Sequence, residues 1–150
     1  RSTRQRDNVM TPLVKKLTFD LRSTRDSINR VTDLISGAFE DLGLPEAVLF
    51  DIKLAVQEAV VNAVEHGNRC DASKMIHVSC DATDDSVSLI VRDEGEGFDL
   101  ARVPDPTLPA NILREHGRGI FLMKNLCDEI RYNDKGNEVT IMKRLRKARV

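Results

Sequence analysis

A polar stripe on an otherwise apolar segment holds the first residues whose types and spacing could do chemistry. Residues 45–66 have helical periodicity, and at about 100° per residue four polar side chains share one narrow stripe: Asp51, Glu58, Asn62 and Glu65. Apolar residues flank this stripe, so its polar groups are costly to bury unless they meet a cation, a ligand or water. The stripe predicts either a Mg²⁺ ion held by the Asn62 amide oxygen, with Glu58 orienting or deprotonating a nucleophile, or plain hydrogen bonds to neighbouring loops.

A second candidate site is the acidic, glycine-containing segment that directly follows a predicted strand. Its sequence is Asp93, Glu94, Gly95, Glu96, Gly97. Glycines at alternate positions permit a tight turn and the close approach of a ligand, and the strand end would hold the Asp93 carboxylate as a hydrogen-bond acceptor. Many hairpin ends share this composition. The segment alone is therefore compatible with a binding loop and with a structural turn.

The third candidate is a glycine-flanked arginine that opens a short predicted helix. Gly117, Arg118 and Gly119 precede the apolar residues 120–127. Backbone amides at a helix N-terminus bind phosphate, and glycines leave them accessible, although such loops are also common architecture. Neither GxxxxGK[ST] nor GxGxxG occurs in the chain, which excludes P-loop and Rossmann-type phosphate sites.

The elements that would position these three segments follow the order strand, helix, helix, strand, strand, loop, helix, strand, strand. Ser23 and Asp26 resemble a capping box at the start of the first helix, and Gly43 ends it. Apolar periodicity predicts the other elements at 16–21, 45–66, 76–82, 87–91, 120–127, 129–132 and 138–143. This order predicts an α+β fold, a two-layer sandwich with helices packed on one face of a mixed, mostly antiparallel β-sheet.

The chain divides into a flexible arm at residues 1–15, one domain at residues 16–145 and a basic tail at residues 146–150. Within the domain, residues 99–116 lack periodicity and contain three prolines. Such a stretch is longer than an ordinary connection in a compact domain. We therefore expect a functional lid over residues 99–116.

Composition excludes several classes of protein. The 150 residues carry 23 basic and 24 acidic side chains, which leaves no overall positive charge to favour direct nucleic-acid binding. We expect no secretory signal, because the first residues are basic and lack an apolar core, and the sequence holds no apolar run of the roughly 20 residues that a membrane span needs. Cys70, Cys80 and Cys127 lack the spacing of a zinc knuckle or a disulfide framework. We expect a cytoplasmic protein that contacts neither nucleic acid nor membrane.

Together, the three segments resemble the N, G1 and G2 boxes of the GHKL (Bergerat-type) ATPase superfamily. The sequences EAVVNAVEHGN at 58–68, RDEGEGFD at 92–99 and GRGIFLM at 117–123 are most similar to bacterial anti-sigma-factor serine/threonine kinases of the RsbW and SpoIIAB type. The resemblance spans about residues 16–145. It implies a GHKL ATP-binding fold with ATP and Mg²⁺ as cofactors.

Matched by position, the resemblance assigns roles to individual residues. Glu58 corresponds to the general base, Asn62 to the magnesium ligand and Asp93 to the carboxylate that receives the exocyclic amine of adenine. Further nucleotide-binding positions correspond to Gly95, Gly97, Gly117, Gly119 and Thr140. Either Arg114 or Arg118 would neutralise charge on the transferred phosphoryl group under the lid, and the resemblance does not decide between them.

The resemblance implies a Mg-ATP-dependent serine/threonine protein kinase and anti-sigma factor that takes part in a partner switch. Its substrate would be a STAS-domain anti-anti-sigma protein and its second partner a sigma factor. Arg30 lies away from the apolar stripe of the first helix and matches a basic position in the family's partner-binding helix. A homodimer is neither required nor excluded.

Two other functions stay open at this point. One is a nucleotide-gated module that sequesters a partner with little or no kinase activity, and the other is a hydrolytic ATPase in which Glu58 activates water. Glu58 favours the kinase over the sequestration module because binding alone needs no positioned base.

Overall fold

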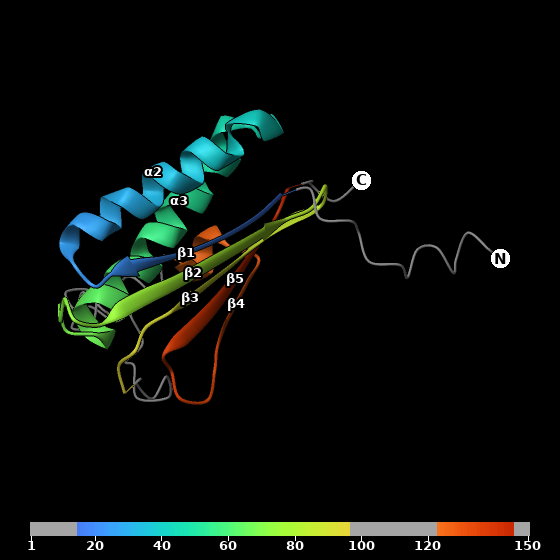
Figure 1. The fold of residues 1–150 in the computed structure, drawn as a ribbon. Helices are drawn as coiled ribbons and strands as arrows, with labels where there is room; N and C mark the ends of the chain where they lie inside the picture. Colours follow the sequence, from blue (N-terminus) through green and yellow to red (C-terminus); the bar gives the residue numbers. More distant parts are fainter. Residues whose placement is uncertain (1–14, 97–122, 146–150) are drawn as a thin grey trace, which may run out of the picture.

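Two helices lie side by side on one face of a five-stranded sheet in the computed structural model (Figure 1). The structure describes residues 15–96 and 123–145. Their elements are β1 (Lys15–Arg22), α2 (Arg25–Phe39), the short 3₁₀ helix η1 (Glu40–Leu42), α3 (Glu46–Val61), the π-helical turn η2 (Asn62–Gly67), β2 (Met75–Ala82), β3 (Ser86–Arg92), β4 (Glu129–Tyr132) and β5 (Glu138–Arg144). Residues 123–126 are also helical.

The strands follow the order β1-β2-β3-β5-β4 across the sheet. The expected hairpin between β2 and β3 is present, and β4 pairs with β5 at one edge. The α+β two-layer class is confirmed, and every described strand pairing is antiparallel, where the sequence had suggested a mixed sheet.

The hydrophobic core fills the space between the sheet and the helices. Strand alternation sends every second side chain of β2, β3 and β5 toward α2 and α3. The largest fully buried side chains of this core include Ile35, Phe39, Ile52, Ile76, Leu89, Met123 and Ile141. Because burial of each such side chain contributes roughly 1.5–3 kcal/mol, this core fixes the positions of the strand ends and helix ends that carry the polar residues.

The start of α2 differs from the expected capping box. The N-cap residue is Thr24, and no side chain caps the first turn. Ser23 instead directly follows β1, where its N–H donates to the Lys74 carbonyl at 3.0 Å. Its buried hydroxyl has no hydrogen-bond partner among the described residues. Ser27 donates its hydroxyl to the Arg22 carbonyl at 2.6 Å. The capping-box prediction was wrong because Ser23 belongs to the strand connection and not to the helix.

The second helix also ends differently from the prediction of one helix over residues 45–66. Regular α-helix stops at Val61, and the six residues Asn62–Gly67 form a π-helical turn. The backbone N–H of Asn68 accordingly donates to the Ala63 carbonyl, five residues back, at 2.8 Å. Such turns are rare and occur frequently at functional sites. This turn changes which side chains point the same way at the end of the helix.

Residues 1–14, 97–122 and 146–150 lie outside the described part of the chain. The expected lid, the basic tail and nearly all of the expected arm fall there. Lys15, the last residue of that arm, begins β1. Across the described ranges, no helix has both the length and the apolar character that crossing a membrane requires.

Candidate functional site

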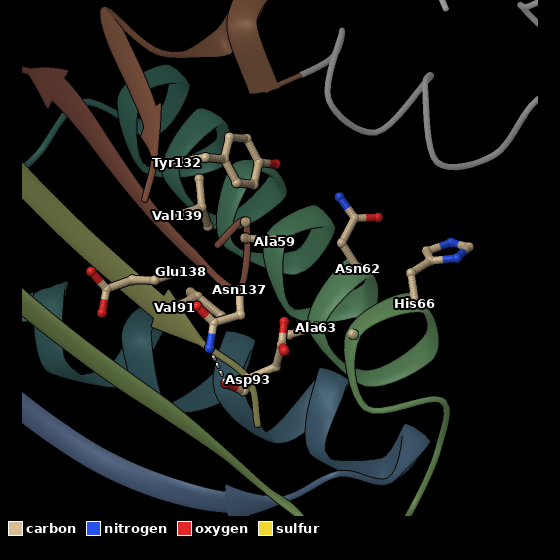
Figure 2. Close-up of a pocket in the computed structure, with 12 residues that line it drawn as sticks. Ala59, Asn62, Ala63, His66, Val91, Asp93, Tyr132, Asn137, Glu138 and Val139 are labelled. Atoms are coloured by element: carbon tan, nitrogen blue, oxygen red, sulfur yellow. Dashed lines mark hydrogen bonds between the residues drawn. The ribbon is translucent and has the colours of Figure 1, made fainter. Parts of the chain in front are cut away.

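A pocket opens between the end of the α3–η2 helix and the hairpin formed by β4 and β5 (Figure 2). Its volume is about 320 Å³, including space that is open to solvent. The helical side is lined by Ala59, Asn62, Ala63, His66 and Gly67. The strand side is lined by Val91, Asp93, Tyr132, Gly136, Asn137, Glu138 and Val139. Two of the three chemistry-bearing segments recognised in the sequence therefore meet at this pocket.

Asp93 is the buried polar residue of this pocket, with 7% of its surface exposed. Its Oδ1 accepts the N–H of Gly95 at 2.8 Å, and no group in the described part of the chain donates to Oδ2. Burial raises the pKa of Asp93, and the Gly95 hydrogen bond lowers it by a smaller amount. A buried carboxylate oxygen that receives no hydrogen bond is costly. A ligand amine could donate the missing hydrogen bond to Oδ2.

Two glycines allow the Asp93 turn to lie directly against the helix end. A Cβ atom on Gly67 would overlap the carboxylate of Asp93, and one on Gly95 would overlap the Gly67 carbonyl. Gly95 was already an expected site residue, whereas Gly67 stood out in the sequence only as part of the 58–68 segment. The contact between Gly67 and Asp93 joins two segments 26 residues apart, which local sequence patterns do not reveal.

Asn62 is half-buried and begins the π-helical turn, with its side chain directed into the pocket (Figure 2). Its side-chain nitrogen is buried and has no hydrogen-bond partner among the described residues. An unpaired buried amide costs about 1–3 kcal/mol. The group fits a Mg²⁺ site because rotation of the amide would present its oxygen, a hard donor that Mg²⁺ accepts.

Glu58 lies one turn before Asn62 on regular α-helix, since the Asn62 N–H donates to the carbonyl oxygens of Glu58 and Ala59. The Glu58 side chain is half-buried. Residues four apart on an α-helix share a face. Glu58 therefore lies on the same side of the helix as the pocket residue Asn62, as the polar stripe predicted.

The other two members of the stripe are engaged outside the pocket. Asp51 forms an ion pair with Lys143 at 3.3 Å. Glu65 forms an ion pair with Arg25 of α2 at 3.5 Å. The wider π-helical turn explains why Glu65 leaves the stripe and His66, four residues after Asn62, lines the pocket instead.

The hairpin turn between β4 and β5 holds the opposite side of Asp93. The Asp93 N–H donates to the Asn137 carbonyl at 2.9 Å, and the Asn137 side-chain N–H donates to the Asp93 carbonyl at 3.2 Å (Figure 2). Asn133 fixes Asn137 by donating to its Oδ1 at 2.7 Å. Gly136 makes the turn possible with a φ of 82°, in the left-handed region.

Thr140, to which the resemblance assigned a nucleotide contact, does not line this pocket. Val139 faces the pocket and Ile141 faces the core, so the alternation of the strand turns Thr140 to the opposite face, where it is paired with Ile90. Asn137 and Val139 of the same hairpin line the pocket. The alternation of Val139 and Ile141 in the sequence already contained this signal.

Tyr132 is a further lining residue that no sequence motif indicated. It is half-buried at the end of β4, and burial raises the pKa of its hydroxyl. The phenol therefore stays neutral and can donate a hydrogen bond at physiological pH. Its apolar ring faces the same pocket as Val139 and Ala59 (Figure 2).

Two groups of predicted residues remain. Gly97, Arg114, Gly117, Arg118 and Gly119 lie outside the described residues. Arg30 is exposed on α2, away from the pocket.

Comparison with known proteins supports the assignment of these segments. The sequence matches the histidine kinase-like ATPase domain family over residues 21–143. Serine-protein kinase RsbW of Staphylococcus epidermidis is 30% identical, with 87% of each chain covered. The RsbW proteins of Oceanobacillus iheyensis and Bacillus licheniformis are 31% and 32% identical, with 72% and 77% of each chain covered.

A similar fold occurs in the crystal structure of the RsbU and RsbW domains of Rv1364c from Mycobacterium tuberculosis. The TM-score is 0.63 at 23% sequence identity, and the match covers 91% of this chain. The chain spans 34% of that longer protein.

The resemblance recognised from the three segments is confirmed, as is the α+β sandwich that it implied. The match to named serine-protein kinases also confirms the expectation of an enzyme of the protein serine kinase class. The chain belongs to the histidine kinase-like ATPase domain family and, within it, to the RsbW serine-protein kinases.

Proposed function

We propose that this chain is a Mg-ATP-dependent serine/threonine kinase and anti-sigma factor that phosphorylates a STAS-domain anti-anti-sigma protein and binds a sigma factor in a partner switch. The observation that carries the proposal is the meeting of Asp93 and Asn62 in one pocket, with Glu58 one turn away. Relatives named as serine-protein kinases over most of their length support a protein as the acceptor.

The adenine base would occupy the end of the pocket near Asp93. The Asp93 Oδ2 oxygen would accept the exocyclic amine, while Val91 and Val139 supply apolar walls for the faces of the ring. Guanine carries a carbonyl oxygen at the equivalent position. This oxygen and the Asp93 carboxylate are both hydrogen-bond acceptors, so no hydrogen bond could form between them. An unmatched buried polar pair discriminates strongly between ligands, so we expect the pocket to prefer ATP over GTP.

The phosphates would extend from the base toward Asn62, whose amide oxygen would hold Mg²⁺. When bound, the ion would neutralise phosphate charge and polarise the transferred phosphoryl group. The proposed phosphate contacts from the backbone of Gly117 and Gly119, and the charge supplied by Arg114 or Arg118, rest on the resemblance alone. The orphaned amide of Asn62 supports the ion site independently.

Glu58 would act as the general base. Its carboxylate would accept the proton of the serine or threonine hydroxyl as the new O–P bond forms and the bond between the γ-phosphorus and the ADP oxygen breaks. Phosphoryl transfer depends mostly on positioning and on charge stabilisation. Placement of Glu58 and Asn62 on consecutive turns of one helix holds base and metal ligand at a fixed separation.

Phosphate transfer from labelled ATP to purified STAS proteins of the same organism tests this proposal. Glu58→Gln should reduce transfer by about 10²–10⁴-fold, the usual contribution of a positioned base, with ATP affinity changed less than about twofold. Asp84→Asn removes an exposed carboxylate from the turn between β2 and β3, away from both the pocket and α2, and serves as the matched control. The expected product is an acceptor protein with labelled phosphate on a serine or threonine.

Two other outcomes would contradict the kinase. Release of phosphate from ATP at the same rate with and without an acceptor protein would indicate a hydrolytic ATPase. Nucleotide-dependent capture of a partner without any turnover would indicate a sequestration module.

We further propose a cytoplasmic domain that begins with β1 at Lys15 and extends to residue 145, preceded by an arm, with a lid at 99–116 and a basic tail at 146–150. The cytoplasm supplies ATP, the proposed phosphate donor, which supports this compartment. All three cysteines, Cys70, Cys80 and Cys127, are free in the structure, as is usual for a reducing environment. Arg30 is the proposed contact for a protein partner.

A further inference from the structure

A histidine lies between two carboxylates on the face of the sheet that α2 and α3 leave uncovered. His77 Nδ1 is 2.7 Å from Oδ1 of Asp20, its partner across the β1–β2 pair, and Nε2 is 2.9 Å from Oε2 of Glu94. A neutral imidazole has one N–H and can donate to only one carboxylate. Both short contacts together therefore require the doubly protonated, positively charged ring.

Glu94 connects this histidine to the pocket because it follows Asp93 directly. The Glu94 N–H donates to Asn68 Oδ1 at 2.8 Å, and its side-chain Oε1 accepts the Met75 N–H at 2.9 Å. Asn68 is itself buried, and its amide donates to the Met75 carbonyl at 3.0 Å. Backbone and side chain of Glu94 thus tie the turn to the helix end and to β2.

The contacts that hold the Asp93 turn differ in their response to pH. Those from Asn68 and Asn137 join neutral groups and do not depend on a proton. The contact from His77 joins two ions and exists in full only while the ring is protonated. Charge-assisted hydrogen bonds are roughly twice as strong as neutral ones, so loss of the proton weakens one side of the turn selectively.

We propose that protonated His77 is a positioning residue, which holds Glu94 and thereby the Asp93 turn in the geometry that accepts the nucleotide base. The inference rests on the proposed function, because Asp93 must be the base-binding carboxylate for the position of its turn to matter. Nucleotide affinity then depends on the charge of a side chain that contacts no nucleotide.

The charged groups around His77 determine the direction of its titration. Glu94 and then Asp20 raise the pKa of His77, whereas partial burial and Arg92, the cross-strand neighbour on β3, lower it by less. Arg92 is itself 3.9 Å from Glu138. A raised histidine pKa means that the contact is complete at lower pH and is lost as pH rises through that pKa.

Calorimetric titration of the full chain with Mg-ATP between about pH 6 and pH 9 tests this inference. Wild-type affinity should fall by about fivefold across the titration of His77, a typical coupling between two sites. His77→Gln should bind with the weaker affinity at every pH, so the wild-type fall disappears from its profile. Subtracting one profile from the other removes the titration of the nucleotide phosphates.

Two further variants separate a loss of positioning from a loss of folding or of surface charge. Glu94→Gln keeps the backbone of the turn and should reproduce the weaker, flattened profile. Asp81→Asn, a partly exposed member of the same strand and sheet face that pairs with Lys16, should follow wild type. Unfolding by urea, followed by circular dichroism, identifies any variant that does not fold.

A second measurement uses reciprocity between the two sites. Because binding energies are linked symmetrically, addition of Mg-ATP should raise the pH midpoint of the His77 ring resonance in NMR spectra of the wild-type chain. An unchanged midpoint, or a His77→Gln profile that matches wild type while ATP still binds, overturns the inference and leaves the proposed function standing. A wild-type chain that binds no ATP at any pH overturns both.

Discussion

The two long helices pack side by side on the same sheet face, yet their buried residues follow different patterns (Figure 1). On α2 the buried residues Ser27, Val31, Ile35 and Phe39 form one narrow stripe. On α3 the buried residues Ile52, Ala55, Val56, Ala59 and Val60 cover a wide arc. The difference arises because α3 packs against β3 and β5 as well as against α2.

Because of this difference, polar side chains have different surroundings on the two helices. A polar side chain on the outer face of α2 is in water, as Asn29 and Arg30 are. From Asp51 to Glu58, the polar side chains of α3 are at least partly enclosed, and Asp51 accordingly has an ion-pair partner in Lys143. Polar residues on an enclosed helix therefore identify a site more reliably than polar residues on an amphipathic one.

The largest effect should come from a methyl group at the end of the enclosed helix. Gly67→Ala places a Cβ atom into the Asp93 carboxylate, so it should weaken ATP binding by at least about 10²-fold, the loss that a misplacement of about 1 Å can cause. Gly37→Ala on α2 is the matched control, because its methyl group would have no atom within 4 Å apart from the adjacent residues and the local helix backbone. That variant should be more stable by about 0.5–1 kcal/mol. Calorimetry and urea unfolding measure the two effects, and equal ATP affinities would contradict the contact.

Asp93→Asn should separate stability from function. The amide nitrogen would face the adenine amine donor to donor, so ATP affinity should fall by about 10²-fold or less, as for an unpaired buried polar group. Burial raises the pKa of Asp93, so the ionised carboxylate destabilises the free protein as pH rises through that pKa. The variant should therefore unfold at a higher urea concentration than wild type at neutral pH, with a smaller advantage in acid. A variant less stable than wild type at neutral pH would contradict this account.

The sequence was sufficient for the features that depend on local periodicity. The buried stripe of α2, the alternation of β2 and β3, and the strand-end position of Asp93 all follow from spacing and were predicted. The association of Asp93 with the helix end came only through the resemblance, because spacing alone left each segment ambiguous.

Most of the features that the sequence did not predict depend on how the chain is packed in three dimensions. The π-helical turn exchanges Glu65 for His66 at the pocket, and a regular period of 3.6 residues cannot foresee it. Asn137 reaches Asp93 only because the β4–β5 hairpin lies beside the end of β3. Thr140 lies outside this pocket, as the alternation of Val139 and Ile141 in the sequence already indicated.

A smaller effect should distinguish two asparagines on the two helices. Asn62→Ala removes the proposed metal ligand, so ATP affinity should become about tenfold weaker in Mg²⁺, as for a hydrogen bond to a charged group, and should lose most of its Mg²⁺ dependence. Asn29→Ala, on the exposed face of α2, should change neither quantity. Titrations with and without Mg²⁺ measure both, and an Asn62→Ala variant that keeps the full Mg²⁺ response would place the ion elsewhere.

The smallest effect on the isolated chain should come from Arg30, which tests whether α2 carries function on its exposed face. Arg30→Ala should change the free energy of unfolding by less than about 0.5 kcal/mol, as for most surface substitutions, and should leave ATP affinity unchanged because α2 does not line the pocket. Affinity for the protein partner should nevertheless fall by about fivefold, the loss of about 1 kcal/mol that separates contributing from neutral interface residues. Arg25→Ala on the same helix removes an exposed arginine that already pairs with Glu65, and it controls for general loss of positive charge. Equal partner affinities for the two variants would show that the exposed face of α2 is simply solvated, as its amphipathic pattern alone would suggest.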